Sequence, residues 1–442
     1  MALFRLGKRF QHAPRMKLCF YPRLPSIRVS SSTLSSMASL KSSPRLLHPS
    51  YRRLCQRAFA TTARRQAELI RIVEVGPRDG LQNEKTSIPV ETKIELVNRL
   101  AKTGLRTIEA GSFVHPRWVP QMANSSKILE HVLQSPPPSP NPITYQWLLP
   151  NSKGLDNFFA AFDASPSTQS TADTGYPTPP PSPATDNGPA LNTSSQDPNA
   201  MPSSTSGVDA MSQSRSQSQS QSQSPSPTSP PTHEVSIFLA ATESFSKTNT
   251  NCSIAESLAR FSPLISSARA RDIRVRAYIS VALGCPFEGP DVNPHRVAEL
   301  AADLLEMGAD EISVADTTGM GTAPRTAELL RTLTAAGIKN EDLALHFHDT
   351  FGQALLNTTV ALEHGIRTFD SAVGGLGGCP YSPGATGNVA TEDLVYCLHS
   401  LGAQTGVDLE AVSRVGEWIM GELGRPNESR AGKATLAGLR NR

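Results

Sequence analysis

From Glu68 onward, short apolar stretches rich in β-branched residues alternate with stretches whose apolar residues recur at helical spacing. Between Val90 and Lys102, for example, Ile94, Val97 and Leu100 are three residues apart, which is typical of one buried helix face. The predicted strands are Glu68–Val75, Thr107–Ala110, Ile143–Leu148, Glu234–Ala241, Arg274–Ser280, Glu311–Ala315, Leu343–His348 and Thr368–Val373. The predicted helices are Val90–Lys102, Trp118–Leu133, Lys153–Asp163, Ser253–Arg269, Val297–Met307, Thr326–Ala335, Gln353–His364, Val389–Leu401 and Leu409–Leu423.

Eight strand–helix units in this order predict an α/β protein folded as a TIM (β/α)8 barrel. A doubly wound parallel sheet is the structural alternative, because it uses the same alternation. We expect the barrel in two parts, residues 66–163 with the first three strands and residues 233–403 with the other five. Residues 404–442 would add a C-terminal helix and tail to the barrel.

The alternation is interrupted by residues 164–232, which are mostly Ser, Thr, Pro and Gln. Only five of these residues are charged, and Tyr176 is the sole aromatic one. Such a segment cannot bury enough apolar surface to offset the entropy lost on ordering. We therefore predict a disordered insertion between the third predicted helix and the fourth predicted strand.

The N-terminal segment differs from the rest of the chain in charge. Residues 1–67 contain 14 of the 42 Lys and Arg residues and none of the 39 Asp and Glu residues, which leaves the remainder with 28 basic and 39 acidic residues, a net charge of −11. A basic, Ser-rich, acid-free segment is typical of a mitochondrial transit peptide, so we predict one over residues 1–65 and a location in the mitochondrial matrix. A disordered basic tail is the alternative.

The acidic remainder carries no basic patch typical of a nucleic-acid-binding protein, so we expect no nucleic-acid partner. No apolar run approaches the length of a membrane span, and we expect none. The six cysteines form no C-x-x-C pair, so the sequence indicates neither a structural zinc site nor a disulfide framework.

The first candidate chemistry lies in the stretch Leu343–Asp349, a predicted strand that ends in His346-Phe347-His348. Residues two apart on a strand share a face, so His346 and His348 would project together while Phe347 points the other way. Two neutral imidazoles placed in this way can bind one divalent metal ion. The alternative is a pair of core histidines satisfied by hydrogen bonds.

Polar residues also follow other predicted strands, at the end where a TIM barrel carries its active site. Arg78 and Asp79 lie in a Gly-Pro loop after the first strand, where a salt-bridged turn is the alternative explanation. The other candidates at these strand ends are Gln82, Glu109, Ser112, Tyr278, Asp316, Cys379 and Asn388. Polar residues at six strand ends of one face favour an active site over unrelated caps and turns.

Three motifs together closely resemble the 3-hydroxy-3-methylglutaryl-CoA lyase family: RDGLQNE at Arg78–Glu84, the H-x-H pair, and GLGGCPY at Gly375–Tyr381. The cysteine-bearing glycine loop is specific to that family, whereas the other two motifs are shared with isopropylmalate and homocitrate synthases. The resemblance implies metal-dependent retro-Claisen cleavage of (S)-3-hydroxy-3-methylglutaryl-CoA to acetyl-CoA and acetoacetate, in leucine catabolism and ketone-body formation. It further implies an acyl-CoA substrate, Mg²⁺ or Mn²⁺ as the cofactor, and a homodimer.

Site roles are implied by position in the family's motifs. The metal ligands would be Asp79, His346, His348 and Asn388, and the catalytic residues would be Cys379, Arg78, Glu109 and Asp316. The substrate-binding residues would be Arg78, Gln82, Ser112 and Tyr278. Arg78 would stabilise the enolate charge at the thioester oxygen, and Cys379 would protonate the departing acetyl-CoA carbanion.

Two other functions remain open on the sequence. One is a Claisen-type synthase of the same superfamily, which would form a C–C bond on a 2-oxoacid. The other is an inactive barrel that recruits partners through the insertion.

Overall fold

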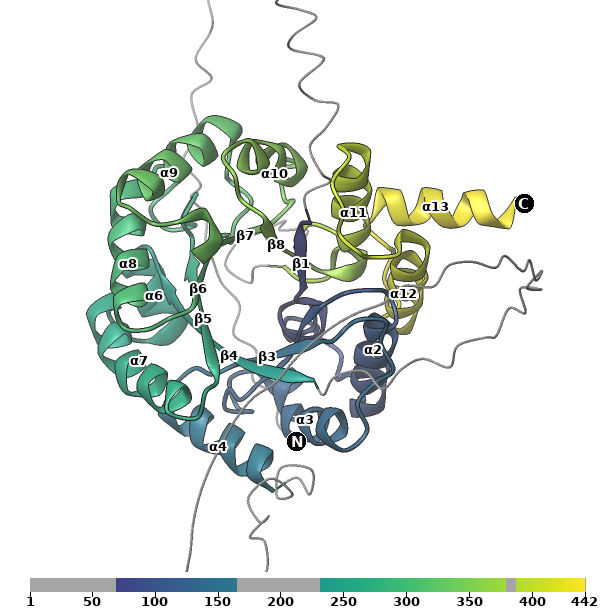
Figure 1. The fold of residues 1–442 in the computed structure, drawn as a ribbon, viewed down its shortest axis with the longest axis horizontal. Coiled ribbons are helices and arrows are strands. Elements are labelled where there is room, and N and C mark those ends of the chain that lie inside the picture. The colour runs from purple at the N-terminus through teal and green to yellow at the C-terminus, as the bar shows by residue number, and fades with distance from the viewer. Residues whose placement is uncertain (1–68, 165–230, 379–386, 442) are drawn as a thin grey trace, which may run out of the picture. The chain divides into compact units, whose positions relative to one another are not determined.

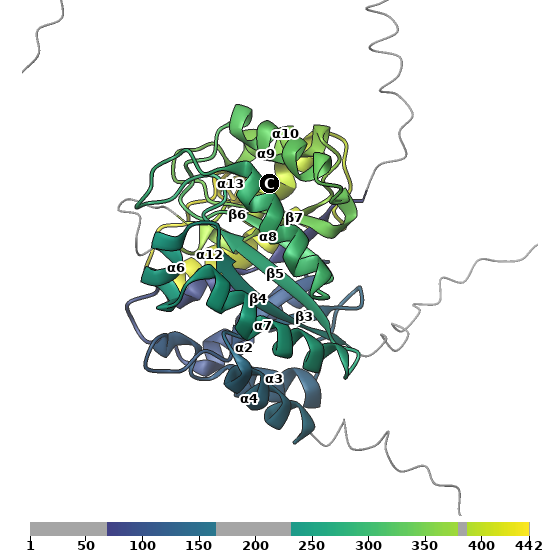
Figure 2. The same cartoon turned by 90° about the vertical axis from the view of Figure 1, so that its left-hand side faces the viewer.

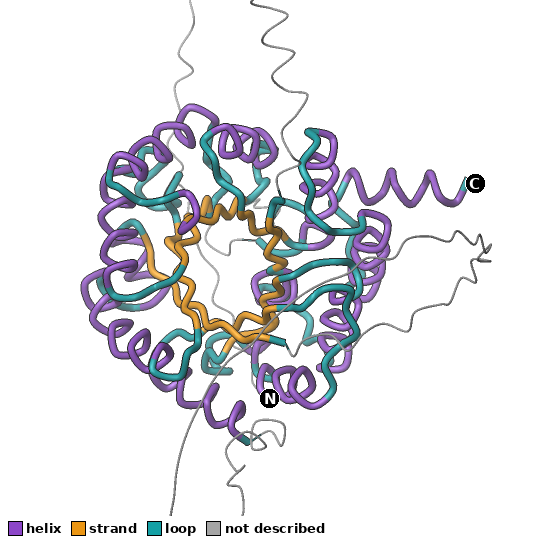
Figure 3. The backbone as a smooth tube through the Cα atoms, in the orientation of Figure 1, coloured by secondary structure: helices purple, strands orange, loops and turns teal. Residues whose placement is uncertain are grey.

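The computed structural model describes residues 69–164, 231–378 and 387–441. The predicted transit peptide and nearly all of the predicted insertion lie outside these ranges, as does Cys379. Within them, eight parallel strands form a closed barrel in the order β1 to β8, which confirms the TIM-barrel prediction and excludes the doubly wound sheet. Figure 3 shows the closed ring of strands surrounded by the helices.

The strands of the barrel are β1 (Arg71–Glu74), β2 (Thr107–Ser112), β3 (Thr144–Leu148), β4 (Thr232–Ala240), β5 (Arg274–Ser280), β6 (Glu311–Asp316), β7 (Leu343–Phe347) and β8 (Thr368–Ser371). The barrel closes where β1 pairs with β8, from Arg71 opposite Thr368 to Glu74 opposite Ser371. The first and last parts of the barrel thus meet at one seam, and the ends of β1 and β8 lie side by side.

The helices are α2 (Val90–Ala101), α3 (Ser125–Gln134), α4 (Ser152–Asp163), α6 (Glu243–Thr250), α7 (Ile254–Arg269), α8 (Pro294–Glu306), α9 (Ala323–Ala335), α10 (Ala354–Glu363), α11 (Thr391–Ser400), α12 (Leu409–Glu422) and α13 (Arg430–Arg440). Most of them surround the strands, and α13 extends away from the ring (Figure 1). In the side view of Figure 2, α7 and α8 cover β4, β5 and β6. None of the described helices is long and apolar enough to cross a membrane.

Alternate residues of the strands have opposite surroundings. Val275, Ile312 and Leu345 are buried in the apolar core that the strands share with the helices. The residues between them, such as Arg276 and Ser313, are polar and hydrogen-bond across the barrel interior. Side chains alternate along a strand. When every second residue packs outward in the apolar core, the residues between them point into the barrel and form its polar inner layer.

Three details of the prediction were wrong. Trp118–Leu133 is not one helix: Pro120 disfavours helical backbone at Val119, and the chain makes a short 3-10 turn before α3 begins at Ser125. Helix α6 was missed because its sequence ESFSKTNT has no apolar periodicity. Helix α13, with Gly432 and Gly438 inside it, was missed because glycine lowers helix propensity.

Candidate active site

Asp79, His346 and His348 meet at the C-terminal end of the barrel strands, although they are far apart in the sequence. One ligand atom from each lies within 4.8 Å of the other two. Asp79 lies in the turn Gly76–Gly80, directly after β1, and His346 and His348 lie at the end of β7. This arrangement is a possible site for a divalent metal ion, because the donors are carboxylate oxygen and imidazole nitrogen.

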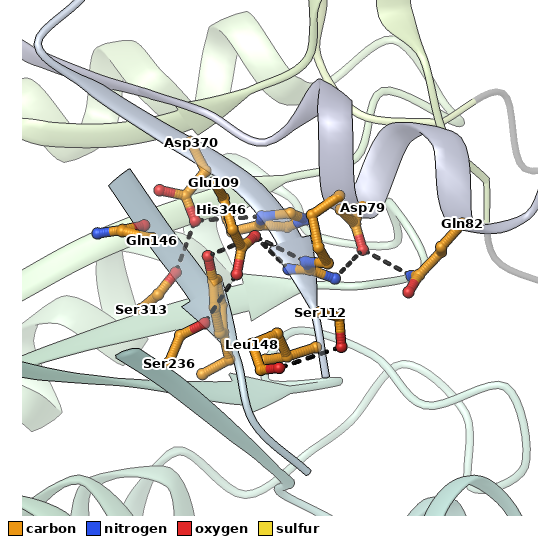
Figure 4. Close-up of polar contacts among 12 residues, drawn as sticks. Asp79, Gln82, Glu109, Ser112, Gln146, Leu148, Ser236, Ser313, His346 and Asp370 are labelled. Atoms are coloured by element: carbon orange, nitrogen blue, oxygen red, sulfur yellow. Dashed lines mark hydrogen bonds and ion pairs between the residues drawn. The ribbon is translucent and has the colours of Figure 1, made fainter. Parts of the chain in front are cut away.

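The ring of His346 is held by a carboxylate behind it. Its Nδ1 lies 3.2 Å from Oδ2 of Asp370, a fully buried residue of β8 (Figure 4). Burial opposes ionisation of Asp370, but the neighbouring Arg276 guanidinium lowers its pKa to about 2. An ionised carboxylate only accepts hydrogen bonds, so Nδ1 of His346 carries a proton in this contact, and Nε2 is the ring nitrogen left to bind a metal ion. This is the tautomer that a metal ligand requires.

Two further observations fit a bound cation. Among the described residues, Nδ1 of His348 and Oδ1 of Asn388 are buried without a hydrogen-bond partner. Burial, together with the neighbouring His346, lowers the pKa of His348 to about 3, so its ring is neutral at pH 7. Burial opposes ionisation of Asp79, but Arg78 and the two histidines lower its pKa. One anion, two imidazoles and an amide oxygen would form a suitable donor set for Mg²⁺ or Mn²⁺.

Asn388 also ties the possible metal site to the glycine loop. Its amide nitrogen donates to Oδ2 of Asp79 at 2.9 Å and to the carbonyl oxygen of Leu376 at 3.0 Å. Residue 388 pairs with His348 across an isolated bridge. The predicted fourth ligand therefore lies next to the other three, with its side-chain oxygen still available.

Arg78 is buried against Glu109, the third residue of β2. Its Nε and Nη2 lie 2.7 Å and 2.6 Å from the same Glu109 oxygen, and its Nη1 donates to Asp79 at 2.7 Å. Burial alone would lower the pKa of Arg78, but the two carboxylates raise it above its usual value. Both explanations of the Arg-Asp pair thus apply, since it forms a salt bridge and also lies at the possible metal site.

Glu109 is saturated by its neighbours. Besides Arg78, it accepts hydrogen bonds from the Tyr278 hydroxyl at 3.2 Å and the Ser236 hydroxyl at 2.8 Å. Asp316, at the end of β6, is in a different state: Oδ2 accepts from Gly321 N at 2.9 Å, and Oδ1 has no partner among the described residues. Burial raises the pKa of Asp316 to about 7. Of the two predicted carboxylates, Asp316 is the one with a free oxygen.

The predicted substrate-binding residues differ in how far their polar atoms are engaged. The side-chain nitrogen of Gln82 donates to Oδ1 of Asp79 at 2.8 Å. The side-chain oxygen of Gln82 takes no part in that contact. The Ser112 hydroxyl donates to the Leu148 carbonyl and accepts from Val114 N, so the backbone already occupies it. The Tyr278 hydroxyl joins Arg276 to Glu109 below the site. Contact of any of them with substrate stays a prediction.

The described residues include the stem of the glycine loop, up to Gly378. Val373–Gly375 forms a 3-10 turn in which Gly374 has φ +68°, a conformation that favours glycine. Asn83 of the RDGLQNE motif donates to the Gly378 carbonyl oxygen at 2.7 Å. Cys379 follows directly in the sequence but lies outside the described residues, so its role stays a prediction.

Sequence reasoning missed Arg276 and Asp370, which orient His346 from behind. Arg276 donates to Asp370 at 2.6 Å and is paired with Glu311 at 2.7 Å, deep inside the barrel. The available signal was an arginine or aspartate in the middle of an otherwise apolar predicted strand. A charged residue there needs a buried partner, and the partner lies on another strand.

Comparison with known proteins agrees with the geometry. A family model described as HMGL-like matches residues 69–170 and 218–419. The hydroxymethylglutaryl-CoA lyase of Pseudomonas mevalonii is 43% identical over 84% of this chain and 98% of its own length. The mitochondrial hydroxymethylglutaryl-CoA lyase of Rattus norvegicus is 41% identical over 83% of this chain and 89% of its own.

The crystal structure of hydroxymethylglutaryl-CoA lyase from Pseudomonas aeruginosa superimposes with a TM-score of 0.65 at 41% identity, covering 84% of this chain and 99% of that one. Relatives named mitochondrial and relatives named cytoplasmic both occur, so they do not fix a cellular compartment. The matched ranges contain Asp79, His346, His348 and Asn388. On the family match and these identities, the chain belongs to the HMGL-like family.

Proposed function

We propose that the protein is a hydroxymethylglutaryl-CoA lyase, which cleaves 3-hydroxy-3-methylglutaryl-CoA to acetyl-CoA and acetoacetate. The observation that carries the proposal is the meeting of Arg78, Asp79, His346, His348 and Asn388 at one end of the barrel. The first two follow β1, the histidines come from the end of β7, and Asn388 follows the glycine loop. Relatives with that name cover nearly all of the folded part of the chain.

Asp79, His346, His348 and Asn388 would hold Mg²⁺ or Mn²⁺, which when bound would withdraw electron density from the substrate's hydroxyl group and make it more acidic. Arg78 would supply positive charge where the thioester oxygen becomes negative. Three of its N–H groups are directed at Glu109 and Asp79, and a guanidinium has five. The remaining two can donate to the substrate, while Glu109 holds the guanidinium in place.

The cleavage needs one base and one acid. We assign the base to Asp316, because its Oδ1 is free among the described residues and its pKa of about 7 suits proton transfer at neutral pH. It would take the hydroxyl proton as the bond between the second and third carbons breaks. The electron pair would move to the thioester, and Cys379 would protonate the resulting carbanion to give acetyl-CoA. The ketone that forms is acetoacetate.

The test is incubation of the purified protein with 3-hydroxy-3-methylglutaryl-CoA and Mg²⁺, followed by quantification of acetoacetate. We expect acetoacetate and acetyl-CoA in equal amounts, with no product when a chelator removes the metal. The control is the His348→Ala variant under the same conditions. Product formation from acetyl-CoA and a 2-oxoacid, without acetoacetate, would instead establish the Claisen-type synthase. No turnover in either direction would favour the inactive barrel.

We further propose a homodimer located in the mitochondrial matrix. The acid-free, basic composition of residues 1–67 supports the location. Light scattering of the purified protein tests the dimer. A fluorescent protein fused to the C-terminal end of residues 1–65 tests the mitochondrial location. In the control fusion, all Arg and Lys residues of that segment are replaced. A cytosolic signal from the unaltered fusion would contradict the location.

A further inference from the structure

Glu74 is a fully buried carboxylate that joins two segments of the proposed site. It is the last residue of β1, at the seam with β8. Its Oε1 accepts a hydrogen bond from Gly76 N at 2.9 Å and another from Val373 N, also at 2.9 Å. Its Oε2 accepts from the Thr391 hydroxyl at 2.6 Å. All three donors are neutral, so the carboxylate holds these groups by hydrogen bonds.

The two amides that share Oε1 begin two different site segments. Gly76 is the first residue of the turn Gly76–Gly80, which carries Arg78 and Asp79. Val373 is the first residue of the turn Val373–Gly375, from which the glycine loop continues toward Cys379. A single oxygen atom therefore fixes the distance between the start of the Arg-Asp turn and the start of the glycine loop.

The surroundings leave little room for either segment to move. A Cβ atom at Gly76 would lie only 2.5 Å from Oε1 of Glu74, and one at Gly80 would lie 2.8 Å from Cβ of Leu376. The next residue of the glycine-loop stem, Gly374, is also held. Its N–H donates to Glu392 at 2.9 Å, and its carbonyl oxygen accepts from Glu428 N at 3.2 Å. Hydrogen bonds thus hold the stem of the glycine loop at Val373 and Gly374. Among the partners that make these bonds, Glu74 is the one that also holds the Arg78–Asp79 turn.

We propose that Glu74 is a positioning residue, whose carboxylate sets the Arg78–Asp79 turn and the stem of the glycine loop, Val373–Gly375, in register with each other. The expected effect of Glu74 on turnover rests on the proposed function, whereas its expected effect on metal binding does not. Glu74 would touch no reacting atom. It acts through Asp79, which would bind the cation, and through the loop that leads to Cys379.

Two substitutions separate the hydrogen bonds from the charge. In Glu74→Gln, the amide oxygen can accept both N–H groups, and the amide nitrogen can donate to Thr391, whose hydroxyl can then turn to Ser371, 2.8 Å away. In Glu74→Met, a side chain of similar length offers no acceptor. We expect Glu74→Gln to stay within about three-fold of the parent in Mn²⁺ affinity and kcat. Glu74→Met should lose roughly ten- to hundred-fold in both, as removal of an outer-sphere partner typically does.

Mn²⁺ affinity is measured by calorimetry on the substrate-free protein, and kcat and KM by acetoacetate formation. A matched control, Leu100→Ala, lowers stability by removing a fully buried side chain near the end of α2 that belongs to neither segment. At a temperature where all variants are folded, the control should keep the parent's Mn²⁺ affinity. If Glu74→Met does not fold, Glu74→Asp replaces it, since a side chain shorter by one methylene cannot reach both amides and should show the same losses.

Parent-like Mn²⁺ affinity in Glu74→Met, or equal losses in Glu74→Gln and Glu74→Met, would overturn the proposal. An equal loss in Leu100→Ala would also overturn it, because the effect would then be one of stability. Loss of Mn²⁺ affinity in Glu74→Met of a protein without lyase activity would support the Glu74 assignment while refuting the proposed function. The two proposals can therefore fail separately.

Discussion

Among the individual side chains, Asp370 fixes which nitrogen of His346 carries the proton. Asp370→Asn keeps the shape but replaces a pure acceptor by a group that can present its NH₂ to Nδ1. We expect Mn²⁺ binding to weaken by roughly ten-fold or more, with the fold intact because Arg276 still pairs with Glu311. Titration calorimetry checks this, with circular dichroism as the control for folding. Unchanged affinity would show that Asp370 does not set the tautomer.

His348 and Arg78 lie in one cluster, but we expect their substitutions to have different effects on metal affinity and on rate. His348→Ala removes a proposed ligand, so metal affinity and rate should fall together and excess Mn²⁺ should restore part of the rate. Arg78→Gln removes charge that matters mainly in the transition state, so kcat should fall on the order of 10²–10³-fold with nearly unchanged metal affinity. Parallel calorimetry and steady-state kinetics compare the two variants. An equal loss of metal in Arg78→Gln would make Arg78 a structural residue.

Cys379 should be the most reactive of the cysteines in the barrel sequence. Cys252 and Cys285 are buried, Cys397 is partly buried, and burial raises the pKa of the Cys397 thiol, which slows alkylation. We expect an alkylating reagent to label Cys379 before these three, and bound substrate to slow that labelling. Cys379→Ser should keep its metal and fold but lose on the order of 10²–10⁴-fold in rate, since serine is a far weaker acid. Peptide mapping by mass spectrometry and the variant's kinetics decide both points.

At the level of helices and strands, the N-terminus of α11 holds the glycine loop through a buried acid. Glu392, the second residue of α11, accepts from Gly374 N, and burial raises its pKa to about 8. The unfolded chain ionises this group near pH 4.5, so the folded state binds more protons at intermediate pH. Stability from this group is therefore complete below about pH 4.5 and is lost as the pH rises toward 8.

Glu392→Gln removes that pH dependence without removing the acceptor oxygen. We expect the variant to gain on the order of 1–3 kcal/mol of unfolding free energy relative to the parent between about pH 5 and pH 8, and no more above about pH 8. Urea unfolding of the metal-free protein at several pH values measures it. A difference that is constant with pH, or that shrinks as pH rises, would contradict the raised pKa.

At the level of the whole molecule, the two points where the insertion joins the barrel lie at the end opposite the proposed site. The insertion joins the end of α4 to the start of β4, whereas the site lies where the strands end. Loop length costs free energy only logarithmically. Replacing residues 166–231 by a short Gly/Ser linker should therefore leave kcat/KM within about three-fold of the parent and raise stability by at most about 2 kcal/mol. A large loss of kcat/KM with the fold retained would give the insertion a role in catalysis.

Prediction and structure agree unevenly along the chain. The strand Arg274–Ser280 was predicted to the residue, because its outward positions, Val275, Ala277 and Ile279, are all apolar. Helix α6 was missed because ESFSKTNT has no apolar periodicity, and α13 was missed because Gly432 and Gly438 lower its helix propensity. Arg78, Asp79, His346 and His348, which the structure brings together at the strand ends, could be named as candidates because they lie in short, recognisable motifs.

The barrel, the resemblance to a lyase family and the candidate ligands could all be read from the amino-acid sequence. These features are local: alternation along a strand, periodicity along a helix, and residues a few positions apart. What lies behind the ligands became known only from the folded chain. Asp370 meets His346 because β7 pairs with β8, and Glu74 meets Val373, almost three hundred residues away, because the barrel closes between β1 and β8. Both contacts follow from strand pairing in the folded barrel, and no local pattern specifies them.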